Sequence, residues 1–520
     1  MPCIQFEELE YELLDGESVL DALIRGGADI DFSCRKGACQ VCMMRLVDGK
    51  VNQQATRRLR PELVAEGHFL PCCAHPTRDL SIDRADTSEV TFEALVARKE
   101  ALSPNVVRLC LEPEINLEWT PGQYLSLLRP DDLARNYSIA SIAEQDYFLI
   151  CHVKRIDGGE MSSWIHDELR EGDFLRLQGP LGDCIYRPPD RGRPLLLLGT
   201  GTGIAPLYGV LRDALRQDHR SPIHIYHGVS RPDELYLDAK LTALANAHDN
   251  VEYVPCVSDA EPDGQGEDEH WFSGHVTNAA FEVHRDAASH VVYLCGNPDM
   301  VYEGRYRAIR AGVRRENILT DPFVSDEPYW PQDNEKIAGI EADPQMWEAL
   351  QEGKLLRVIL KDLYDQIYED PKLSPFFHNS TKERAISKQY EFLASLFNEG
   401  ASYFGLLPFN AHHWMIISDE LFDYREDLLE KCIRRQDLPE HLIRRWMSIQ
   451  ELFRREIVKS KERGMIIDGK ESLKTGYSRE TLAIGSLCDG CRRELPSGTE
   501  GIMHQRTGEF YCQRCNPSST

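Results

Sequence analysis

The sequence predicts a multidomain protein that combines an α/β segment, an all-α segment and small cysteine-rich segments at both ends. Residues 92–326 alternate β-rich runs such as PLLLLG and HVVYLCG with helical runs, which is typical of an α/β fold. Residues 343–463 space their apolar side chains for helices. The chain has 16 cysteines, and those that form clusters lie near its two ends. We therefore expect domains at residues 1–87, 92–189, 190–326, 343–460 and 480–520, with a polar linker at 327–342.

The charge of the chain excludes some functions. Lys and Arg number 59 and Asp and Glu number 85, so the net charge is −26. A chain this acidic is a poor nucleic-acid binder and a poor ligand for anionic membranes. No apolar run approaches the roughly 18 residues of a spanning helix, and the acidic N-terminus lacks a signal-peptide core. We expect a cytoplasmic protein, in which clustered thiols indicate metal sites rather than disulfides.

The first cysteine cluster has the spacing C-x4-C-x2-C, with a further cysteine about 30 residues later: Cys34, Cys39, Cys42 and Cys72 or Cys73. This is the plant-type [2Fe–2S] spacing. The small residues Gly37 and Ala38 allow backbone N–H groups to turn toward the sulfurs. A zinc site or unpaired thiols are the alternative.

Residues 1–87 resemble plant-type ferredoxins, which implies a β-grasp domain with a [2Fe–2S] cluster. In that family the last ligand usually follows a Leu-x-Cys pattern, which Leu70-Pro71-Cys72 matches. The resemblance therefore favours Cys72 as the fourth ligand, with Cys73 as the alternative.

Two short strings in residues 92–189 suit a flavin dinucleotide. In Arg135-Asn136-Tyr137-Ser138, a guanidinium can pair with a pyrophosphate, a Tyr ring can cover an isoalloxazine face and a Ser hydroxyl can bond flavin N5. In the run 158–163 (GGEMSS), a Gly-Ser helix start can bind phosphate through free N–H groups.

A second pair of strings suits a nicotinamide dinucleotide. The strand PLLLL leads into Gly199-Thr200-Gly201-Thr202-Gly203, where glycines after a strand let a pyrophosphate approach the backbone. The spacing differs from G-x-G-x-x-G. A later strand ends in Cys295-Gly296-Asn297-Pro298.

Together, these strings over residues 92–326 resemble the ferredoxin–NADP reductase superfamily, with a β-barrel FAD domain and an α/β NAD(P) domain. A ferredoxin ahead of this module resembles the reductases of phenol hydroxylase, methane monooxygenase and benzoate dioxygenase. The resemblance assigns FAD to Arg135, Tyr137, Ser138, Gly159, Met161, Ser162 and the terminal aromatic Phe323, and the nicotinamide dinucleotide to Gly201, Gly203, Pro206, Cys295 and Gly296.

The choice between NADH and NADPH depends on a short run after the next predicted strand. Asp233 and Glu234 would repel a 2′-phosphate, which favours NADH. Arg231 leaves NADPH open.

The helical segment resembles truncated globins over about residues 343–460, on the runs LYDQIYEDPKLSPFF, KQYEFL and ISDELFD. The resemblance implies haem b bound through His412, with Phe377 packed on the porphyrin and Tyr364 and Gln389 as the polar distal pair. Ala385 takes the position that carries His in many globins. His413 remains the alternative iron ligand, and a plain helix bundle is the alternative fold.

The last cysteines have the spacing C-x2-C-x20-C-x2-C of a four-cysteine zinc ribbon: Cys488, Cys491, Cys512 and Cys515. A rubredoxin-like iron site is the alternative. A closed zinc site of this kind would be structural and carry no electrons.

These modules suggest an NAD(P)H-driven electron-transfer oxidoreductase that reduces its fused haem for O2 or NO chemistry, with nitric oxide dioxygenation as the expected reaction. The alternative is a reductase that passes electrons through its ferredoxin to a separate oxygenase, with the globin as an O2 or NO sensor. A third reading, an O2 carrier or scaffold, makes no use of the reductase strings.

Overall fold

The computed structural model divides into two compact units, Met1–Glu327 and Pro328–Thr520, each described by itself. It describes the whole chain except residues 1, 8, 14–16, 29, 31–36, 38–39, 41, 58, 60, 86–90, 132, 260–270, 324–328, 378–380, 399–402, 404, 460–462, 468, 473–475, 483–485, 492, 506–508 and 517–520. Within that part, no helix is both long and apolar enough to cross a bilayer.

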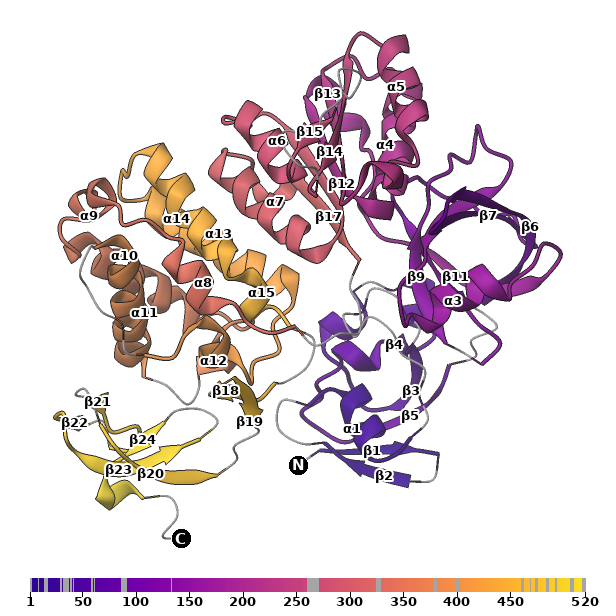
Figure 1. The fold of residues 1–520 in the computed structure, drawn as a ribbon. Coiled ribbons are helices and arrows are strands. Elements are labelled where there is room, and N and C mark those ends of the chain that lie inside the picture. The colour runs from indigo at the N-terminus through magenta and orange to yellow at the C-terminus, as the bar shows by residue number, and fades with distance from the viewer. Residues whose placement is uncertain are drawn as a thin grey trace. The chain divides into compact units, whose positions relative to one another are not determined.

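The N-terminal domain is a small mixed sheet with one packed helix, as expected for a β-grasp fold (Figure 1). The strand order is β2-β1-β5-β3-β4, and β1 and β5 run parallel. Helix α1 begins after Ser18, whose hydroxyl accepts the Asp21 N–H, and buries an apolar face on the sheet. The elements are β1 (Cys3–Phe6), β2 (Leu9–Glu12), α1 (Val19–Arg25), β3 (Met44–Asp48), α2 (Pro61–Ala65), β4 (His68–Phe69), η2 (Pro71–Cys73) and β5 (Leu80–Arg84).

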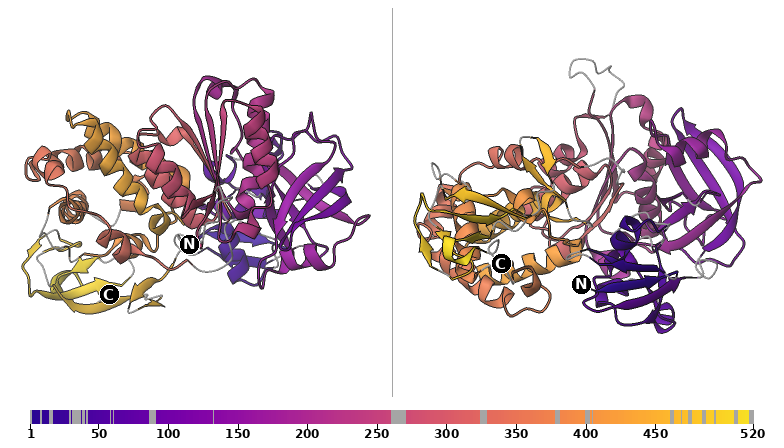
Figure 2. Two further views of the ribbon diagram at one scale, coloured as in Figure 1. Left: turned by 45° about the horizontal axis from the view of Figure 1, so that its top comes forward. Right: turned by 90° about the horizontal axis from the view of Figure 1, so that it is seen from below.

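The second domain is a six-stranded antiparallel barrel with strand order β10-β7-β6-β11-β8-β9. A bridge between Ile139 and Cys151 links the two end strands, and Figure 2 shows the sheet curling round. Alternating side chains of these strands fill the interior. The elements are β6 (Thr91–Ser103), β7 (Val106–Pro113), β8 (Tyr124–Leu128), β9 (Ala134–Ser138), β10 (Leu149–Lys154), α3 (Glu160–Asp167) and β11 (Phe174–Leu181).

The third domain is a parallel sheet with strand order β15-β14-β13-β12-β16-β17. Helices α4 and α5 lie on one side and α6 and α7 on the other (Figure 1). The chain moves outward in opposite directions from β12, so a crevice is expected where the C-terminal ends of β12 and β16 meet. The elements are β12 (Leu195–Thr200), η5 (Gly201–Gly203), α4 (Ile204–Arg216), β13 (Ile223–Val229), α5 (Asp238–Ala247), β14 (Val251–Val257), β15 (Phe272–Ser273), α6 (Val276–Val283), β16 (Val291–Gly296), α7 (Pro298–Arg310) and β17 (Ile318–Pro322).

The second unit begins with an all-helical domain. Its helices have strong start signals: Thr381 caps α11 and Ser418 caps α13, each accepting an N–H of the first turn. Trp446, fully buried, packs edge-on against Phe397 at 5.5 Å between ring centroids. The helices are α8 (Asp333–Ala338), α9 (Pro344–Ala349), α10 (Lys354–Ile367), η8 (Ser374–Phe377), α11 (Lys382–Phe397), α12 (Pro408–His412), α13 (Asp419–Arg434), α14 (Glu440–Leu452) and α15 (Arg454–Ile457).

The segment 327–342, predicted as a linker, contains helix α8 and belongs to this unit from residue 328 onward. The Lys336 ammonium pairs with the fully buried Glu456 at 2.7 Å, and Tyr329 donates a 2.6 Å hydrogen bond to the same carboxylate. The segment is therefore packed against the end of the helical domain instead of serving as a free connector.

Short strands complete the chain. The hairpin β18 (Met465–Ile467) and β19 (Lys470–Ser472) follows the helices. The tail then forms a three-stranded sheet of order β20-β23-β24 and a small hairpin. Its elements are β20 (Tyr477–Thr481), β21 (Ser486–Leu487), β22 (Glu494–Leu495), β23 (Glu500–His504) and β24 (Phe510–Tyr511).

Candidate functional site

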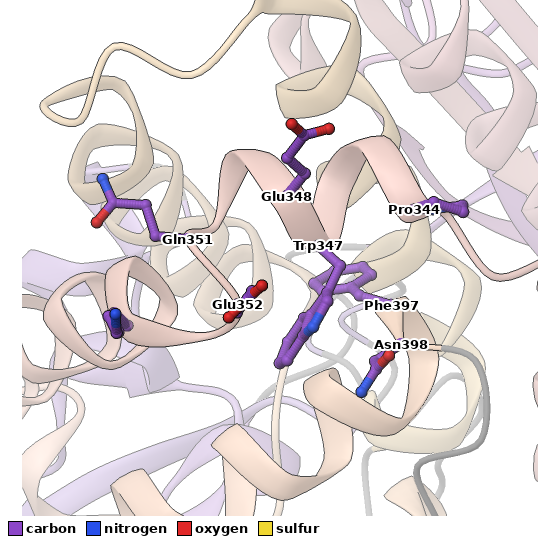
Figure 3. A pocket seen from close by; sticks show the side chains of 8 residues that line it. Pro344, Trp347, Glu348, Gln351, Glu352, Phe397 and Asn398 are labelled. Carbon is purple, nitrogen blue, oxygen red and sulfur yellow. The ribbon is translucent and has the colours of Figure 1, made fainter.

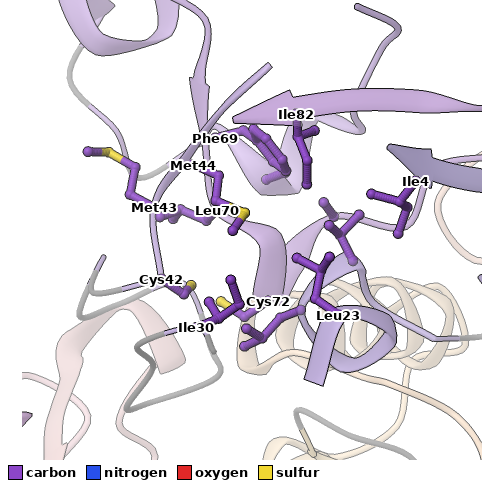
Figure 4. Packing of buried hydrophobic residues seen from close by; sticks show 14 of the residues in the cluster. Ile4, Leu23, Ile30, Cys42, Met43, Met44, Phe69, Leu70, Cys72 and Ile82 are labelled. Atoms are coloured by element: carbon purple, nitrogen blue, oxygen red, sulfur yellow. The ribbon is translucent and has the colours of Figure 1, made fainter. Parts of the chain in front are cut away.

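The described cysteines of the first cluster lie at one edge of the N-terminal core. Cys42 and Cys72 are both buried, and Figure 4 shows them beside Ile30 below the packed side chains of the sheet. Cys34 and Cys39 lie outside the described residues. The structure therefore places two predicted ligands, one from the loop before β3 and one from η2.

The turn at Cys72 and Cys73 is held rigidly. Asn52 donates to the Cys73 carbonyl at 2.9 Å and accepts the His75 N–H at 2.8 Å. Gly37 has a φ of +69°, and a Cβ there would lie 2.7 Å from Cys73 Sγ. Only glycine fits this approach of the loop to the turn. The Cys72 and Cys73 sulfurs are 3.8 Å apart, so the position of this turn does not distinguish between them. Cys72 as the fourth ligand therefore stays a prediction.

Strand β9 presents the predicted flavin residues on alternating faces. Arg135 and Tyr137 share one face, and their neighbour Asn136 accepts a hydrogen bond from Ser126 at 2.7 Å. Burial raises the pKa of Tyr137 well above its ordinary value, so its phenol stays neutral. A neutral aromatic ring and a guanidinium on one strand face suit an isoalloxazine and its pyrophosphate.

The start of α3 uses its side chains for structure. Met161 and Ser162 are buried; the Ser162 hydroxyl accepts the Ile156 N–H at 3.1 Å and donates to the Gly159 carbonyl at 3.2 Å. Gly159 is the N-cap residue of α3, and no side chain caps the N–H groups of the first turn. A phosphate here would therefore meet the free N–H groups of the first turn, with these residues shaping the turn.

The nucleotide-domain glycines bring the ends of β12 and β16 together. A Cβ on Gly203 would lie 2.2 Å from the Cys295 carbonyl oxygen, and one on Gly296 would lie 2.5 Å from the Thr200 carbonyl oxygen. Thr200 Oγ1 also accepts the Asn297 N–H at 2.9 Å. Gly203 and Gly296 therefore permit a close approach of the two backbone segments. Gly201 lies just before α4 and Pro206 in its first turn, next to the C-terminal ends of β12 and β16 where a crevice is expected.

Cys295 is fully buried at the end of β16. Its Sγ lies 3.7 Å from the Sγ of Cys184, and burial raises its thiol pKa well above the ordinary value. The thiol is therefore neutral and packed, and it would contribute shape beside a nicotinamide ring instead of nucleophilic chemistry. Phe323 follows β17, its N–H donates to the Gly296 carbonyl at 2.8 Å, and the residue is 36% exposed.

Asp321 is a site residue that the sequence does not reveal. Strand β17 pairs Asp321 with Cys295 in register, and the Ser138 hydroxyl donates to Asp321 Oδ2 at 2.7 Å. Burial raises the pKa of Asp321 to about 6. An acid that titrates near neutral pH therefore lies between a predicted flavin residue and a predicted nicotinamide residue.

The predicted distal pair is formed in the helical domain. The Tyr364 hydroxyl on α10 donates a 2.8 Å hydrogen bond to Gln389 Oε1 on α11, and the Phe377 ring lies edge-on to Tyr364 at 5.7 Å between centroids. Ala385, one turn before Gln389, is buried. In the described part of the chain, no hydrogen bond uses the Gln389 amide nitrogen, so the pair retains donor capacity.

The predicted proximal histidine ends α12. His412 Nδ1 lies 2.8 Å from the Pro408 carbonyl oxygen, four residues earlier, which fixes the tautomer that leaves Nε2 as a lone-pair donor. Burial lowers the pKa of His412 to about 4, so the imidazole is neutral, as a metal ligand must be. His413 makes a similar contact to the Asn410 carbonyl at 2.7 Å and is more buried, so it remains the alternative. The donor set fits a haem group.

The four tail cysteines converge. Their sulfurs all lie within 4.8 Å of one another, on the segments around β21, β22 and β24. The Cys512 N–H also donates to Cys488 Sγ at 3.2 Å. Four thiolates from two turns fit a tetrahedral ion such as zinc.

A separate cavity of about 500 Å³ lies where α9, the start of α10 and the end of α11 meet (Figure 3). The aromatic rings of Trp347 and Phe397 and the acidic side chains Glu348 and Glu352 line it. None of the predicted site residues is among its lining, so it is distinct from the haem residues.

The fold and these residues define a nicotinamide-dependent flavin and iron–sulfur oxidoreductase joined to a globin. Family models match in four segments: "2Fe-2S iron-sulfur cluster binding domain" at 4–77, "Oxidoreductase FAD-binding domain" at 93–186, "Oxidoreductase NAD-binding domain" at 197–304 and "Bacterial-like globin" at 345–455. They confirm the predicted fold class and the order of its modules.

The curated relatives agree. The reductase subunit of an aromatic O-demethylase from Amycolatopsis sp. is 34% identical over 321 residues, which is 59% of this chain and 94% of that protein. The ferredoxin–NAD(P)(+) reductase component of the naphthalene 1,2-dioxygenase/salicylate 5-hydroxylase systems from a Ralstonia sp. is 30% identical over 317 residues, 59% of this chain and 94% of the relative. A crystal structure of an Amycolatopsis cytochrome P450 reductase is 28% identical with a TM-score of 0.46, covering 63% of this chain and 100% of that one. The chain belongs to this family of iron–sulfur flavoprotein reductases, and continues into a globin domain.

Proposed function

We propose that this NAD(P)H-dependent oxidoreductase delivers its electrons to the haem of its own globin domain and supports O2 or NO chemistry there, most directly nitric oxide dioxygenation. The observation that carries the proposal is the presence in one chain of the reductase strings, with Ser138 bonded to Asp321, and a globin that keeps His412 and the Tyr364–Gln389 pair. A globin that turns over a ligand oxidatively needs repeated reduction, which the fused reductase would supply.

Each reductase residue has a part in that proposal. When bound, FAD would convert the two-electron hydride of NAD(P)H into single electrons for the iron centres. Tyr137 would cover the flavin ring, Arg135 would pair with the pyrophosphate, and Cys295, Gly296 and Phe323 would shape the place of the nicotinamide. Asp321 would accept the hydrogen bond of the Ser138 hydroxyl and so hold that side chain in place.

The globin residues would govern the ligand. His412 would hold the iron through Nε2, while Pro408 fixes the ring orientation. The Gln389 amide N–H would donate a hydrogen bond to a polarised ligand, while the Tyr364 hydroxyl holds the other end of that amide through its bond to Oε1. The four-cysteine site would hold zinc as a structural element.

The surroundings of Arg231 support NADH as the donor. The Arg231 guanidinium, which could bind a 2′-phosphate, lies 3.3 Å from Asp233 and 3.9 Å from Glu234. Two carboxylates therefore already neutralise it and would repel a phosphate. A cytoplasmic location, where NADH is available, stays a prediction.

Anaerobic mixing with NADH tests the proposal. In the purified, haem-replete protein, we expect the ferric Soret band to convert to the ferrous one without any partner protein. NO-dependent NADH consumption should then appear in air. Lack of NO turnover by the intact protein would remove the dioxygenase assignment.

A second function is favoured by the relatives, which are reductase components of oxygenase and demethylase systems by name. In that case electrons would leave through the iron–sulfur domain to a separate oxygenase, and the globin would sense O2 or NO. Reduced flavin and cluster beside a persistently ferric haem would favour this alternative in the same experiment.

A further inference from the structure

Two side chains on strand β10 of the barrel contact the nucleotide domain. Alternate residues of β10 fill the barrel interior, so His152 and Lys154, two positions apart, lie on its outer face. His152 Nδ1 lies 3.2 Å from the Tyr236 hydroxyl, and the two rings meet edge-on with their centroids 5.5 Å apart. The Lys154 ammonium lies 3.8 Å from the Glu234 carboxylate. The barrel therefore holds the run 234–236 at two points.

The run held in this way adjoins the residues expected to choose between NADH and NADPH. Glu234 is one of the two acidic residues of that choice, and Tyr236 follows it by two positions. The Tyr236 N–H donates to the Glu234 carbonyl at 2.9 Å, so the ring is tied to the backbone of the run. The contact of its hydroxyl with His152 therefore fixes this backbone as well as the ring.

Tyr236 also contacts the strand beside the glycine turn. His227, fully buried on β13, meets the Tyr236 ring edge-on at 6.0 Å between centroids. The register of β12 with β13 pairs His227 with Gly199, where the glycine run begins. Tyr236 therefore joins three parts of the reductase: the outer face of the barrel, the run 234–236 and the strand next to the predicted pyrophosphate turn.

The rings of this cluster are uncharged at neutral pH. Burial lowers the pKa of His152 to about 3 and the pKa of His227 to about 4, and it raises the pKa of Tyr236 well above its ordinary value. The contact between His152 and Tyr236 is therefore a neutral hydrogen bond, which is directional and contributes modestly to stability. A directional bond between two domains suits a role in positioning.

We propose that Tyr236 is a positioning residue for hydride transfer: its hydroxyl, bonded to His152, holds the nucleotide domain against the barrel and so sets the place of the nicotinamide relative to the flavin. In that step NADH donates a hydride, equivalent to two electrons and one proton, to oxidised FAD, which gives NAD+ and FADH−. Because the bond joins the two domains to each other, its loss should slow this transfer more than it weakens NADH binding. The inference concerns the reductase alone and is independent of the haem chemistry.

The test uses the full-length, FAD-replete protein mixed anaerobically with NADH in a stopped-flow instrument. The loss of flavin absorbance at increasing NADH concentrations gives the limiting rate constant of reduction and the NADH dissociation constant. With Tyr236→Phe, which removes only the hydroxyl, we expect the limiting rate constant to fall about threefold to tenfold, within the range for one neutral hydrogen bond. The NADH dissociation constant should change by less than about twofold.

Tyr226→Phe is the matched control. The Tyr226 hydroxyl lies 3.3 Å from His284 Nε2, and both residues belong to the nucleotide domain, so this variant loses a similar contact without touching the barrel. It should leave the limiting rate constant unchanged. An equal loss in Tyr226→Phe would show a general effect of the fold and would overturn the positioning role.

A double-mutant cycle tests whether the two residues act through one bond. His152→Phe leaves the Tyr236 hydroxyl without its partner, whereas the double variant with Tyr236→Phe removes both groups, so it should slow reduction no more than the more affected single variant. His152→Gln, whose amide can bond the hydroxyl, should retain more of the wild-type rate than His152→Phe. Additive losses, or an unchanged limiting rate constant in folded, FAD-replete Tyr236→Phe, would overturn the proposal. A raised NADH dissociation constant at an unchanged limiting rate constant would also overturn it, because the run would then only bind the nucleotide.

Discussion

The Ser138 hydroxyl donates a 2.7 Å hydrogen bond to Asp321 Oδ2, and so joins strand β9 of the barrel to strand β17 of the nucleotide-domain sheet. The two residues are far apart in sequence, and neither domain alone contains the contact. Burial raises the pKa of Asp321 to about 6, while the hydrogen bond from Ser138 opposes that rise.

This relationship predicts a pH-dependent stability. The raised pKa means that the folded chain binds the Asp321 proton more tightly than the unfolded chain, so this stabilisation is complete below about pH 4 and is lost as the pH rises through about 6. The Asp321→Asn variant has no titrating group at this position, so it does not lose stability in this way. The melting temperature of Asp321→Asn relative to wild type should therefore rise between about pH 5 and pH 8, measured by thermal unfolding.

Ser138→Ala is the matched control for that experiment. It removes the bond that favours the charged carboxylate, so the pKa of Asp321 in the folded chain should rise further and the loss of stability should extend to higher pH. A difference between Asp321→Asn and wild type that does not vary with pH would show that Asp321 has an ordinary pKa.

The fourth ligand of the iron–sulfur cluster can be assigned with two variants. Cys72→Ser should abolish the visible absorbance of the cluster, and Cys73→Ser should retain it, because the Leu70-Pro71-Cys72 context matches the family pattern. NADH oxidation with ferricyanide should persist in both, since it needs only the flavin and nucleotide domains. Loss of the cluster in Cys73→Ser alone would reverse the assignment.

The nucleotide preference depends on the carboxylates around Arg231. With Asp233→Asn and Glu234→Gln combined, we expect kcat/KM for NADPH to rise about fivefold relative to NADH, since exposed ion pairs each contribute a modest energy. Steady-state kinetics with both nucleotides measure this. Arg231→Ala in the same background is the control and should remove the gain; an unchanged ratio would place the 2′-position elsewhere.

The four-cysteine tail is expected to hold one zinc ion per chain and to stabilise helix α11. Asp489, between two of the cysteines, accepts the Phe510 N–H at 2.6 Å and forms a buried ion pair with Arg384 on α11. Cys491→Ser should therefore lose the metal and increase amide hydrogen exchange near Arg384, while α10 stays protected. Elemental analysis and exchange mass spectrometry provide the readouts; iron in place of zinc would indicate a rubredoxin-like site.

Sequence reasoning proposes candidate sites where the chemistry depends on residue spacing. The cysteine patterns and the glycine run at 199–203 impose local geometry, and the structure shows why at Gly37 and Gly203, where a Cβ would collide. Such constraints are local, so they can be read from neighbouring residues.

Residues that act through tertiary contacts were not visible in the same way. Asp321 stands in a short run, LTDPF, and only the register of β16 with β17 brings it beside Cys295. The polar segment 327–342 resembles a linker, because its packing depends on the single buried partner Glu456.

The last prediction concerns the iron ligand, because the assignment of function depends on it most. His412→Ala should abolish or scramble haem binding, since it removes the imidazole that Pro408 orients through a 2.8 Å contact to Nδ1. His413→Ala should retain a five-coordinate haem spectrum. NADH oxidation with an artificial acceptor should survive both changes, whereas NO-dependent NADH consumption should disappear with His412→Ala alone. His413→Gln is a further control, because His413 is buried and its loss could disturb folding. If haem binding failed in both folded His413 variants and persisted in His412→Ala, His413 would be the ligand, and the family register from Ile417 onward would have to shift by one residue.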